Sequence, residues 1–425
     1  MINLRTIKYY FITANFLLLL FICCNPSNLK SDQVLTAILD KDAATISVFV
    51  GNKNQPIVVQ NARSGFRPYL HPIAPPDGKG LLTENSPEHH AHQTGLYWGF
   101  TRVNGRAMGL DSLMEFFYES KTKEQIAIKG RDYFHNPGED YWKRVSFDVI
   151  DSVGEKVSWQ TVYFMLDENG EPLMKETQVW SAQVLEEQYL LELEWTGEAI
   201  EEVVIGEMKY GGMFLRMPWK EGINGEVVNF SRQKNEKAEG QQSLWMDVGM
   251  QVEGRDDLAH IAIFDHPENR GFPQTWRVDS QFGVGPSRAI MGDWKILKGE
   301  TEIIKHGLVV YTGELNDLDL TEKWKGYIGD DNLYATAGLW EIAQEAGFEA
   351  RFLTADEQVD EMTVTGGYKV NAWASEPMIT QPMAFCWDDK GRLWIAENRD
   401  YESRGSGFSG SGDSRILIIE DTNGD

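Results

Sequence analysis

Cysteine is scarce in this 425-residue chain, which contains three. Cys23 and Cys24 end an apolar N-terminal run, and processing at that point leaves Cys386 as the only other thiol. No intrachain disulfide framework is then available, so stability must come from a hydrophobic core. The sequence also lacks a Gly-rich phosphate loop after a strand and any strand–helix–strand rhythm, which argues against nucleotide-binding α/β folds.

Positive charge is the second shortage. The 65 acidic residues outnumber the 40 Lys and Arg residues, which gives a formal net charge of -25. A net anion is repelled by nucleic acids and by anionic membrane surfaces, so we expect neither as a partner. The 14 Trp residues have two interpretations: core residues of a large β-sandwich, or platforms on which sugar rings stack.

The N-terminus has the pattern of an export signal. Arg5 and Lys8 precede the apolar run 11–22, which is shorter than the ~20 residues of a membrane span. The run ends in a sequence like a bacterial lipobox, in which the small Cys23 precedes Cys24. We therefore predict lipidation at Cys24 and a place in the bacterial cell envelope, held to the membrane by the lipid anchor only and facing the periplasm or the exterior. An ordinary cleaved signal peptide is the alternative.

Most of the remaining chain alternates apolar and polar residues, the pattern of half-buried strands. We expect an all-β fold, an antiparallel β-sandwich, of which the galactose-mutarotase-like supersandwich is one form. Apolar residues at 110, 113, 114 and 117 are spaced as on one face of a helix, which predicts a helical insertion over residues 107–131. The expected strands include 44–50, 56–60, 157–166, 175–182, 188–195, 203–205, 214–217, 227–230, 244–250, 260–264 and 303–311.

The C-terminal region returns to short strands with Gly-rich turns, at 368–373, 383–387, 392–397 and 415–420. These equal about one blade of a β-propeller, and one blade cannot bury both faces of its sheet. We therefore expect the natural polypeptide to continue past Asp425. The predicted domains are a lipoprotein signal peptide (1–24), a tether (25–43), a β-sandwich domain (44–327), a linker with short helices (328–365) and the N-terminal fragment of an incomplete β-propeller (366–425).

Five of the eight histidines lie between residues 71 and 135. On a strand, His90 and His92 would point to the same face and could bind one divalent metal ion at about 2.0–2.1 Å. Without a metal, imidazole groups serve as general acids and bases because they titrate near neutral pH. The alternative is a polar loop cluster in which these side chains only hydrogen-bond. The candidate catalytic residues are His71, His90, His92 and His135, and the candidate metal ligands are His90 and His92.

A loop rich in acidic and aromatic residues follows the predicted insertion. Asp132 lies near Tyr141 and Trp142, a composition found in sugar clefts, where carboxylates bind hydroxyls and rings stack. Trp98, at the end of the histidine-rich stretch, is a further candidate platform. These four side chains are the candidate substrate-binding residues, and a chance gathering of acids in a loop is the alternative.

Five short motifs in the predicted sandwich domain are at 67–72 (RPYLHP), 90–98 (HAHQTGLYW), 210–212 (YGG), 265–269 (DHPEN) and 272–276 (FPQTW). In these motifs residues 44–327 resemble the PmoA-like family, a domain of unknown function labelled methane oxygenase PmoA. The label implies a copper or other metal site made by histidines. The family's usual D-H-P-H-H-R-G-L-W run is altered here, because Gln93 replaces the second paired histidine and Thr94 replaces the arginine.

Three further motifs lie near the C-terminus, at 374–378 (ASEPM), 391–397 (GRLWIAE) and 419–425 (IEDTNGD). Here the chain resembles the start of the propeller in planctomycete-type haem-binding, membrane-bound dehydrogenase-like proteins. Such proteins usually carry a C-x-x-C-H haem motif. This sequence has none, so haem is not expected of this chain.

The leading hypothesis is an exported lipoprotein whose β-sandwich binds or processes carbohydrate, as the N-terminal part of a longer dehydrogenase-like protein. If the protein is an enzyme, we expect histidine acid–base or metal-assisted chemistry, with a divalent metal as the candidate cofactor. Two alternatives belong to other classes: a non-catalytic glycan-binding or scaffolding module, and a copper or other metal-binding protein.

Overall fold

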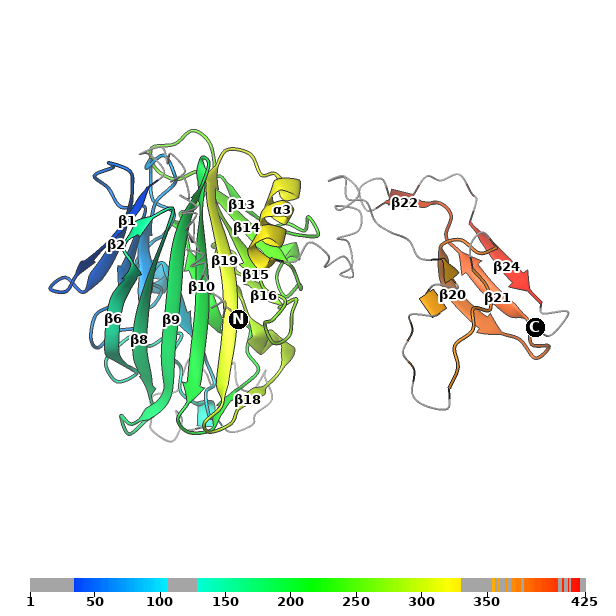
Figure 1. Cartoon of the computed structure of the whole chain (residues 1–425), viewed down its shortest axis with the longest axis horizontal. Coiled ribbons are helices and arrows are strands. Elements are labelled where there is room, and N and C mark those ends of the chain that lie inside the picture. Colours follow the sequence, from blue (N-terminus) through cyan, green and yellow to red (C-terminus); the bar gives the residue numbers. More distant parts are fainter. Residues whose placement is uncertain are drawn as a thin grey trace, which may run out of the picture. The chain divides into compact units, whose positions relative to one another are not determined.

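The chain is described here by a computed structural model (Figure 1). The structure describes residues 34–105 and 128–329 and, with interruptions, residues 354–420. The chain divides into two compact units, Met1–Leu315 and Asn316–Asp425. The predicted signal peptide with Cys24, and most of the predicted insertion 107–131, lie outside the described residues.

A large antiparallel sheet, called the first sheet, contains the N-terminal strands of the first unit. Its described strands are β1 (Leu35–Asp40), β2 (Thr45–Val50), β3 (Val58–Asn61), β4 (Tyr69–Ile73), β5 (Leu96–Gly99), β7 (Val153–Gly154), β12 (Gly212–Arg216), β16 (Trp276–Val278) and β17 (Gly283–Pro286). They are hydrogen-bonded in the order β16-β17-β12-β5-β4-β3-β2-β1-β7. Chain order and sheet order coincide from β1 to β5, so a simple meander builds the part of the sheet beside the histidine-rich stretch.

The second sheet contains the longest strands, which run side by side across the front of Figure 1. Its described strands are β6 (Trp142–Asp151), β8 (Lys156–Leu166), β9 (Pro172–Leu185), β10 (Gln188–Ala199), β13 (Gly225–Asn229), β14 (Trp245–Met250), β15 (Ala259–Asp265) and β19 (Thr301–Thr312). They follow the order β13-β14-β15-β19-β10-β9-β8-β6, with antiparallel pairing throughout. This arrangement confirms the predicted all-β, antiparallel class.

Smaller elements complete the first unit. They are the antiparallel pair β11 (Val203–Ile205) and β18 (Trp294–Ile296) and the 3-10 helices η1 (Glu88–His90), η2 (Asn235–Lys237) and η3 (Arg288–Met291). No helix in the described part of the chain is long and apolar enough to span a membrane.

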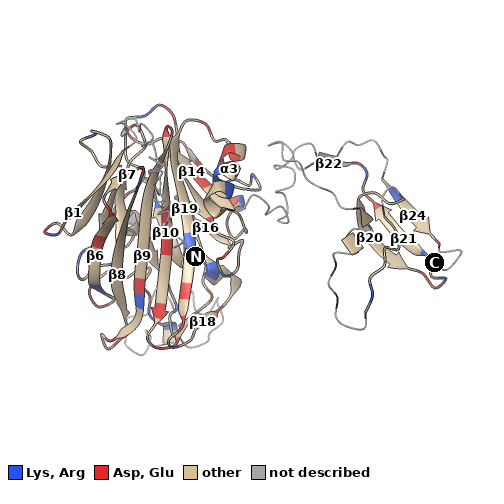
Figure 2. Ribbon diagram, viewed as in Figure 1, with Lys and Arg blue, Asp and Glu red and all other residues tan. Residues whose placement is uncertain are grey.

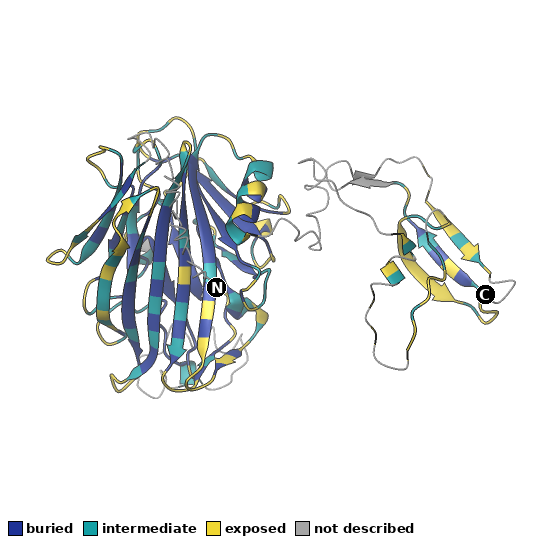
Figure 3. Cartoon of the chain, viewed as in Figure 1, coloured by how far each residue is buried: buried dark blue, intermediate teal, exposed yellow. Residues whose placement is uncertain are grey.

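The two large sheets pack face to face around one core. The indole rings of Trp98 on β5 and Trp195 on β10 stack across the interface, with ring centroids 4.7 Å apart. Polar side chains in the core find partners there too, since Trp159 Nε1 on β8 donates to Gln60 Oε1 on β3 over 3.1 Å. Figure 3 shows the result as buried positions that run along the central strands of the second sheet, with exposed positions at loops and edges.

Charge is distributed in the way that a sandwich requires. Acidic and basic positions mark the loops and scattered sites along the strands of the second sheet, β9, β10 and β19 among them (Figure 2). Several carboxyl groups are nevertheless buried, and Glu176 on β9 is one of them, with 1% of its surface exposed. It accepts hydrogen bonds from Trp195 Nε1 at 2.8 Å and Gln178 Nε2 at 2.9 Å. Burial raises the pKa of Glu176 to about 7.

The second unit begins with helix α3 (Asp317–Ile328). The Asn316 side chain caps its N-terminus by accepting from the Asp319 N–H over 3.1 Å, and Gly329 ends it in a left-handed conformation with φ 67°. Its described strands are β20 (Pro382–Trp387), β21 (Leu393–Glu397), β22 (Tyr401–Ser403), β23 (Gly407–Phe408) and β24 (Arg415–Ile419).

The sheet β20-β21-β24 keeps apolar side chains on both faces. The in-register pairs Phe385↔Ile395 and Trp394↔Ile418 lie on opposite faces, and Phe385 and Ile418 are both exposed. The predicted strands at 383–387, 392–397 and 415–420 are confirmed. The predicted strand 368–373 is wrong, since those residues are described without strand pairing. A complete propeller blade stays a prediction.

The predicted tether 25–43 needs one correction. Residues Leu35–Asp40 form strand β1, which pairs with β2 and with β7. Leu35 and Ala37 are buried at alternate positions, so this short segment covers the edge of the core instead of leaving it.

Candidate functional site

The histidine-rich stretch folds as a compact loop and not as the predicted strand. His90 ends the 3-10 helix η1, His92 lies in the following turn, and β5 begins only at Leu96. Pro87 precedes the helix in an extended conformation, and the loop is closed by hydrogen bonds from Ser86 N to Gln93 O at 2.7 Å and from Gln93 N to His90 O at 2.9 Å. The alternation of histidines was therefore misread as strand periodicity.

The loop nevertheless brings three imidazole rings together. The ring centroids of His90 and His92 are 5.7 Å apart, and those of His92 and His135 are 4.4 Å apart. Tyr210 adds its ring at 5.4 Å from His135. We call His90, His92 and His135 the histidine cluster. Each member keeps part of its surface exposed, so the cluster meets solvent.

Asp132 orients His135. Nδ1 of His135 lies 2.9 Å from Asp132 Oδ2, and the His135 backbone N–H donates to Asp132 Oδ1 over 3.1 Å. Burial by itself would raise the pKa of Asp132, but the His135 ring and Lys129, 3.4 Å away, hold it below its ordinary value. Because the carboxyl group is therefore ionised, Nδ1 is the nitrogen of His135 that donates, and Nε2 becomes its basic nitrogen.

His92 behaves differently from a solvent-exposed imidazole. Burial, with help from the charges of His135, Arg67 and His90, lowers the pKa of His92 to about 3. The ring is therefore neutral at physiological pH. Its Nε2 atom is buried and has no hydrogen-bond partner among the described residues. Leaving a buried polar atom without a hydrogen bond lowers the stability of the folded protein by about 1–3 kcal/mol, and packing contacts do not replace the missing bond.

Arg67 lies beneath the histidine cluster with no exposed surface. Its guanidinium donates to the backbone oxygens of His92 and Phe134, the latter at 2.6 Å, and stacks 3.7 Å from the centroid of the Tyr97 ring. Burial lowers the pKa of Arg67 to about 10, so it stays charged at neutral pH. Arg67 was not among the predicted site residues, although it begins the 67–72 motif.

A second fully buried arginine explains the altered family motif. Arg216 on β12 donates through Nε to the Gln93 side-chain oxygen and through Nη2 to Asp279 Oδ2 at 2.8 Å. The amide at position 93 is thus committed to the interior and takes no part in the histidine cluster. Thr94, at the family's arginine position, lies 3.3 Å from Arg67 Nε through its hydroxyl oxygen.

Three of the other predicted site residues have structural roles here. Trp98 is buried in the core stack described above, and Trp142 is 1% exposed with its Nε1 donating to Asn136 O over 3.1 Å. Neither indole offers an exposed face to a sugar ring, because each is buried in the sandwich core. His71 on β4 bonds the Thr83 hydroxyl at 3.0 Å, and no contact joins its ring to the histidine cluster among the described residues. Tyr141 keeps a partly exposed ring with the Arg131 guanidinium 3.7 Å from its centroid.

The predicted metal site at His90 and His92 gains no third ligand from the described residues. Among the residues that the structure describes, no group of three or more His, Cys, Asp or Glu side chains is placed to hold a metal ion. Tetrahedral zinc sites use at least three protein ligands, so the described donors do not fit such an ion. A divalent metal at these two histidines stays a prediction, and no chemistry is derived from it.

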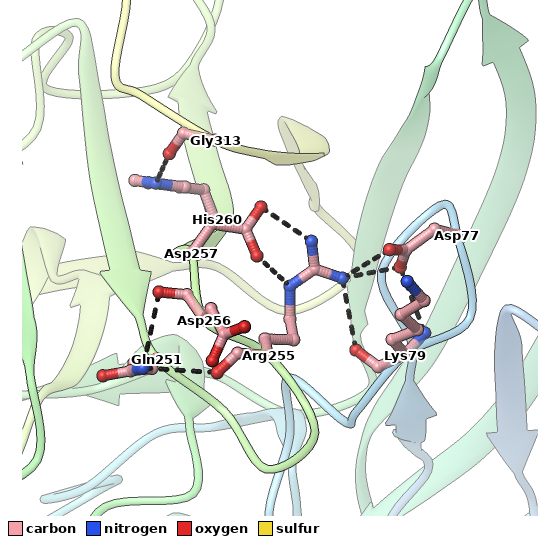
Figure 4. A network of polar contacts seen from close by, with 8 residues as sticks. All are labelled: Asp77, Lys79, Gln251, Arg255, Asp256, Asp257, His260 and Gly313. Atoms are coloured by element: carbon pink, nitrogen blue, oxygen red, sulfur yellow. Dashed lines mark hydrogen bonds and ion pairs between the residues drawn. The ribbon is translucent and has the colours of Figure 1, made fainter.

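A second histidine–aspartate pair lies in the other sheet. His260 on β15 bonds Asp247 Oδ2 on β14 through Nδ1 at 2.8 Å and the Gly313 oxygen through Nε2 at 3.0 Å. Figure 4 shows His260 reaching Gly313, and nearby Arg255 placed between Asp257 and Asp77. Arg255 bonds both carboxylates, at 2.6–3.0 Å, which ties the loop after β4 to the loop before β15.

The fold and the cluster define an antiparallel β-sandwich protein with a histidine-rich loop beside its first sheet. The chain belongs to the family of unknown function DUF6807, whose model matches residues 54–325, more than half of the chain. A domain of unknown function, DUF7133, matches residues 354–425. No curated protein matches the chain.

Several solved structures are similar to part of the chain. The GH36 α-galactosidase AgaB from Geobacillus stearothermophilus matches with 8% identity and a TM-score of 0.30, over 66% of this chain and 41% of that chain. A galactose mutarotase related enzyme from Lactobacillus acidophilus matches with 7% identity and a TM-score of 0.28, over 65% and 97%. A galactose mutarotase-like protein from Lactobacillus casei ATCC 334 matches with 7% identity and a TM-score of 0.29, over 65% of this chain and 100% of that chain. The chain thus spans less than half of the α-galactosidase, and likenesses of this size assign no activity.

Proposed function

We propose that the sandwich domain binds carbohydrate and acts on it by acid–base chemistry at the histidine cluster, with His135 as the general base. The observation that carries the proposal is the hydrogen bond between buried Asp132 and His135, whose ring lies 4.4 Å from that of His92. A carboxylate that orients a partly exposed imidazole is the arrangement that proton transfer needs.

The chemistry follows from the protonation states. With Asp132 ionised and bonded to Nδ1, His135 takes a proton on Nε2, and the carboxylate stabilises the imidazolium that forms. His92 stays neutral beside it, so it adds no positive charge to oppose that protonation. A general base of this kind contributes typically ~10²–10⁴-fold to a rate.

Carbohydrate is favoured as substrate by the chemistry around the cluster. A polyanion is opposed by the net charge of -25, whereas a neutral polyhydroxylated molecule is not. Imidazole, carboxylate and phenol groups are suited to hydroxyl recognition, and the partly exposed Tyr141 ring offers an apolar face. The resemblances to copper proteins and to haem-binding dehydrogenase-like proteins remain secondary proposals. For a copper ion, no group of three or more His, Cys, Asp or Glu side chains among the described residues is placed to hold it.

The test compares the full-length protein with its His135→Gln variant on a panel of mono- and oligosaccharides, such as galactose, glucose, cellobiose and xylotriose. His266→Gln is the control, since His266 is another loop histidine, buried with 9% of its surface exposed and with its Nδ1 accepting from the Glu268 N–H over 3.2 Å. We expect binding by thermal shift in all three proteins and product formation in all but His135→Gln. Binding with no product in the unmodified protein would support a non-catalytic module, and no response to any sugar would refute the proposal.

Export and lipid anchoring are a separate proposal that rests on the N-terminal sequence alone. Residues 11–22 and Cys24 match a lipoprotein signal. We expect a labelled fatty acid to be incorporated in bacteria that express the full-length chain, and Cys24→Ala to abolish the label. Equal labelling of the variant would show that Cys24 is not the lipidated residue and would overturn the proposal.

A further inference from the structure

We propose that Arg67 is a positioning residue, which holds His92 and His135 in contact from beneath. The inference rests on the proposed function for its meaning, since the two histidines are the proposed acid–base groups. The contacts themselves are independent of any substrate. No motif or resemblance gave Arg67 this role.

The geometry is that of one side chain bound to two separate chain segments. Arg67 Nη2 donates to the His92 oxygen and Nε lies 3.3 Å from the Thr94 hydroxyl oxygen, on the segment that carries His92. Nη1 lies 2.6 Å from the Phe134 oxygen and 3.4 Å from the Tyr133 oxygen, on the segment that carries His135. The guanidinium therefore joins the backbone of the segment that carries His92 to the backbone of the segment that carries His135.

The environment keeps this bridge in one orientation. Arg67 has no exposed surface, and its Cζ atom lies over the Tyr97 ring, 3.7 Å from the ring centroid. The backbone N–H of Arg67 also donates to the Pro137 oxygen over 2.9 Å, a third link to the segment around His135. A stacked, planar fork with donors in several directions cannot be reproduced by the single ammonium group of lysine.

Other contacts join the two segments further along the chain, because the Tyr133 and Phe134 N–H groups donate to the Phe100 oxygen at 2.8 and 3.2 Å and the Phe134 ring centroid lies 5.2 Å from that of Tyr97. Residues 85–94 close on themselves through local hydrogen bonds, and Asp132 bonds His135 within its own turn. Nearer the rings, the Arg67 guanidinium binds the backbone of both segments, and the ring centroids of His92 and His135 are 4.4 Å apart. Loss of the guanidinium bridge should therefore separate the rings while leaving each loop formed.

The experiment measures ring proximity directly. The full-length protein is prepared with isotope-labelled histidine rings, and the nuclear Overhauser cross-peak between His92 and His135 is compared in the unmodified protein, Arg67→Lys and Arg102→Lys. Arg102 is a matched control, because it is 6% exposed and its Nη1 donates to the Glu207 oxygen at 2.8 Å, away from both histidine segments. We expect both variants to lower the melting temperature and only Arg67→Lys to lose the cross-peak.

A retained cross-peak in folded Arg67→Lys would overturn the inference, and so would its loss in Arg102→Lys. If Arg67→Lys does not fold, Thr94→Val replaces it, since this change removes one acceptor of the bridge and should weaken the cross-peak. Unchanged intensity in Thr94→Val would then overturn the inference. The measurement uses no sugar, so a failed carbohydrate assay leaves its outcome intact, and the two proposals fail separately.

Discussion

The fold contains two histidine–aspartate pairs that look alike at the level of one hydrogen bond. His135 and Asp132 are 2.9 Å apart, and His260 and Asp247 are 2.8 Å apart. The side chain of His135 is 22% exposed, whereas that of His260 is 1% exposed. The first pair joins residues of one turn, and the second joins neighbouring strands of the second sheet.

The surroundings of each pair decide what it can do. His260 uses both ring nitrogens in bonds to the protein. The Tyr311 ring stacks on the His260 ring with the centroids 4.5 Å apart, and the Tyr311 hydroxyl donates to Asp247 Oδ1 at 2.7 Å. Although burial alone would lower it, the pKa of His260 is raised by Asp247, which favours a structural ion pair. The His135 ring is instead partly exposed and lies next to a second imidazole, that of His92, with the ring centroids 4.4 Å apart. A histidine–aspartate bond is therefore a functional sign only where the ring meets solvent and other reactive groups.

Replacing the aspartate of the exposed pair should have the largest effect on activity. In Asp132→Asn the amide no longer favours the Nδ1–H form or stabilises the imidazolium, so turnover of a sugar that the unmodified protein processes should fall by ~10²–10⁴-fold. Steady-state kinetics measure this, with urea unfolding as the check that the variant is folded. A fall of less than tenfold would mean that Asp132 only supports the loop.

Replacing the histidine of the buried pair should have the reverse result. His260→Leu leaves the Asp247 carboxylate in the core with only the Tyr311 hydroxyl as a described partner, which should cost about 3–5 kcal/mol of unfolding free energy. Urea denaturation measures the loss, and sugar turnover per folded molecule should stay unchanged. Lost turnover in a folded variant would remove the distinction between the pairs.

Sequence periodicity predicted the long strands because their pattern is local. In β10, Tyr189, Leu191 and Leu193 are buried at alternate positions, and a reader of the sequence sees that alternation directly. β1 was assigned to a tether because six residues between polar segments carry little signal, and its pairing with β2 and β7 depends on partners elsewhere. The same short-range ambiguity placed His90 and His92 on a strand, when a 3-10 helix and a turn hold them.

The candidate site was predictable only in its residue types. The Asp132–His135 bond is local, and both residues were selected from the sequence, but in separate roles. Arg67 was missed because its bonds to His92 and Phe134 join residues 25 and 67 positions apart. Trp98 and Trp142 were selected as platforms because composition does not tell a core indole from a surface one.

The buried carboxyl group of Glu176 gives a pH test of the core that does not involve the histidine cluster. Its folded pKa of about 7 exceeds the value of 4.5 that it has in water, so the stability it contributes is present below pH 4.5 and is lost as the pH rises toward 7. Glu176→Gln removes this loss, which at 1.36 kcal/mol per pKa unit amounts to at most about 3 kcal/mol.

The variant should be less stable than the unmodified protein at pH 4, where one of the bonds from Trp195 and Gln178 is lost, and more stable above pH 7. Melting temperatures across pH 4–8 test this crossing. A constant difference would mean that Glu176 has the same pKa in both states. The groups with lowered pKa, His92 and His306, have the opposite sign, because their contribution is present above pH 6.5 and lost as the pH falls.

The smallest effect on stability and activity is expected from replacing His71. This change tests whether the candidate site around Asp132 and His135 extends to β4. His71→Leu removes the bond to the Thr83 hydroxyl, which also accepts from the Ile73 N–H at 3.0 Å, so the loss should be about 1 kcal/mol. Urea unfolding measures that loss, and sugar turnover should be unchanged because no described contact joins this ring to the histidine cluster. A fall in turnover comparable to that of Asp132→Asn would place His71 in the reaction and extend the site onto β4.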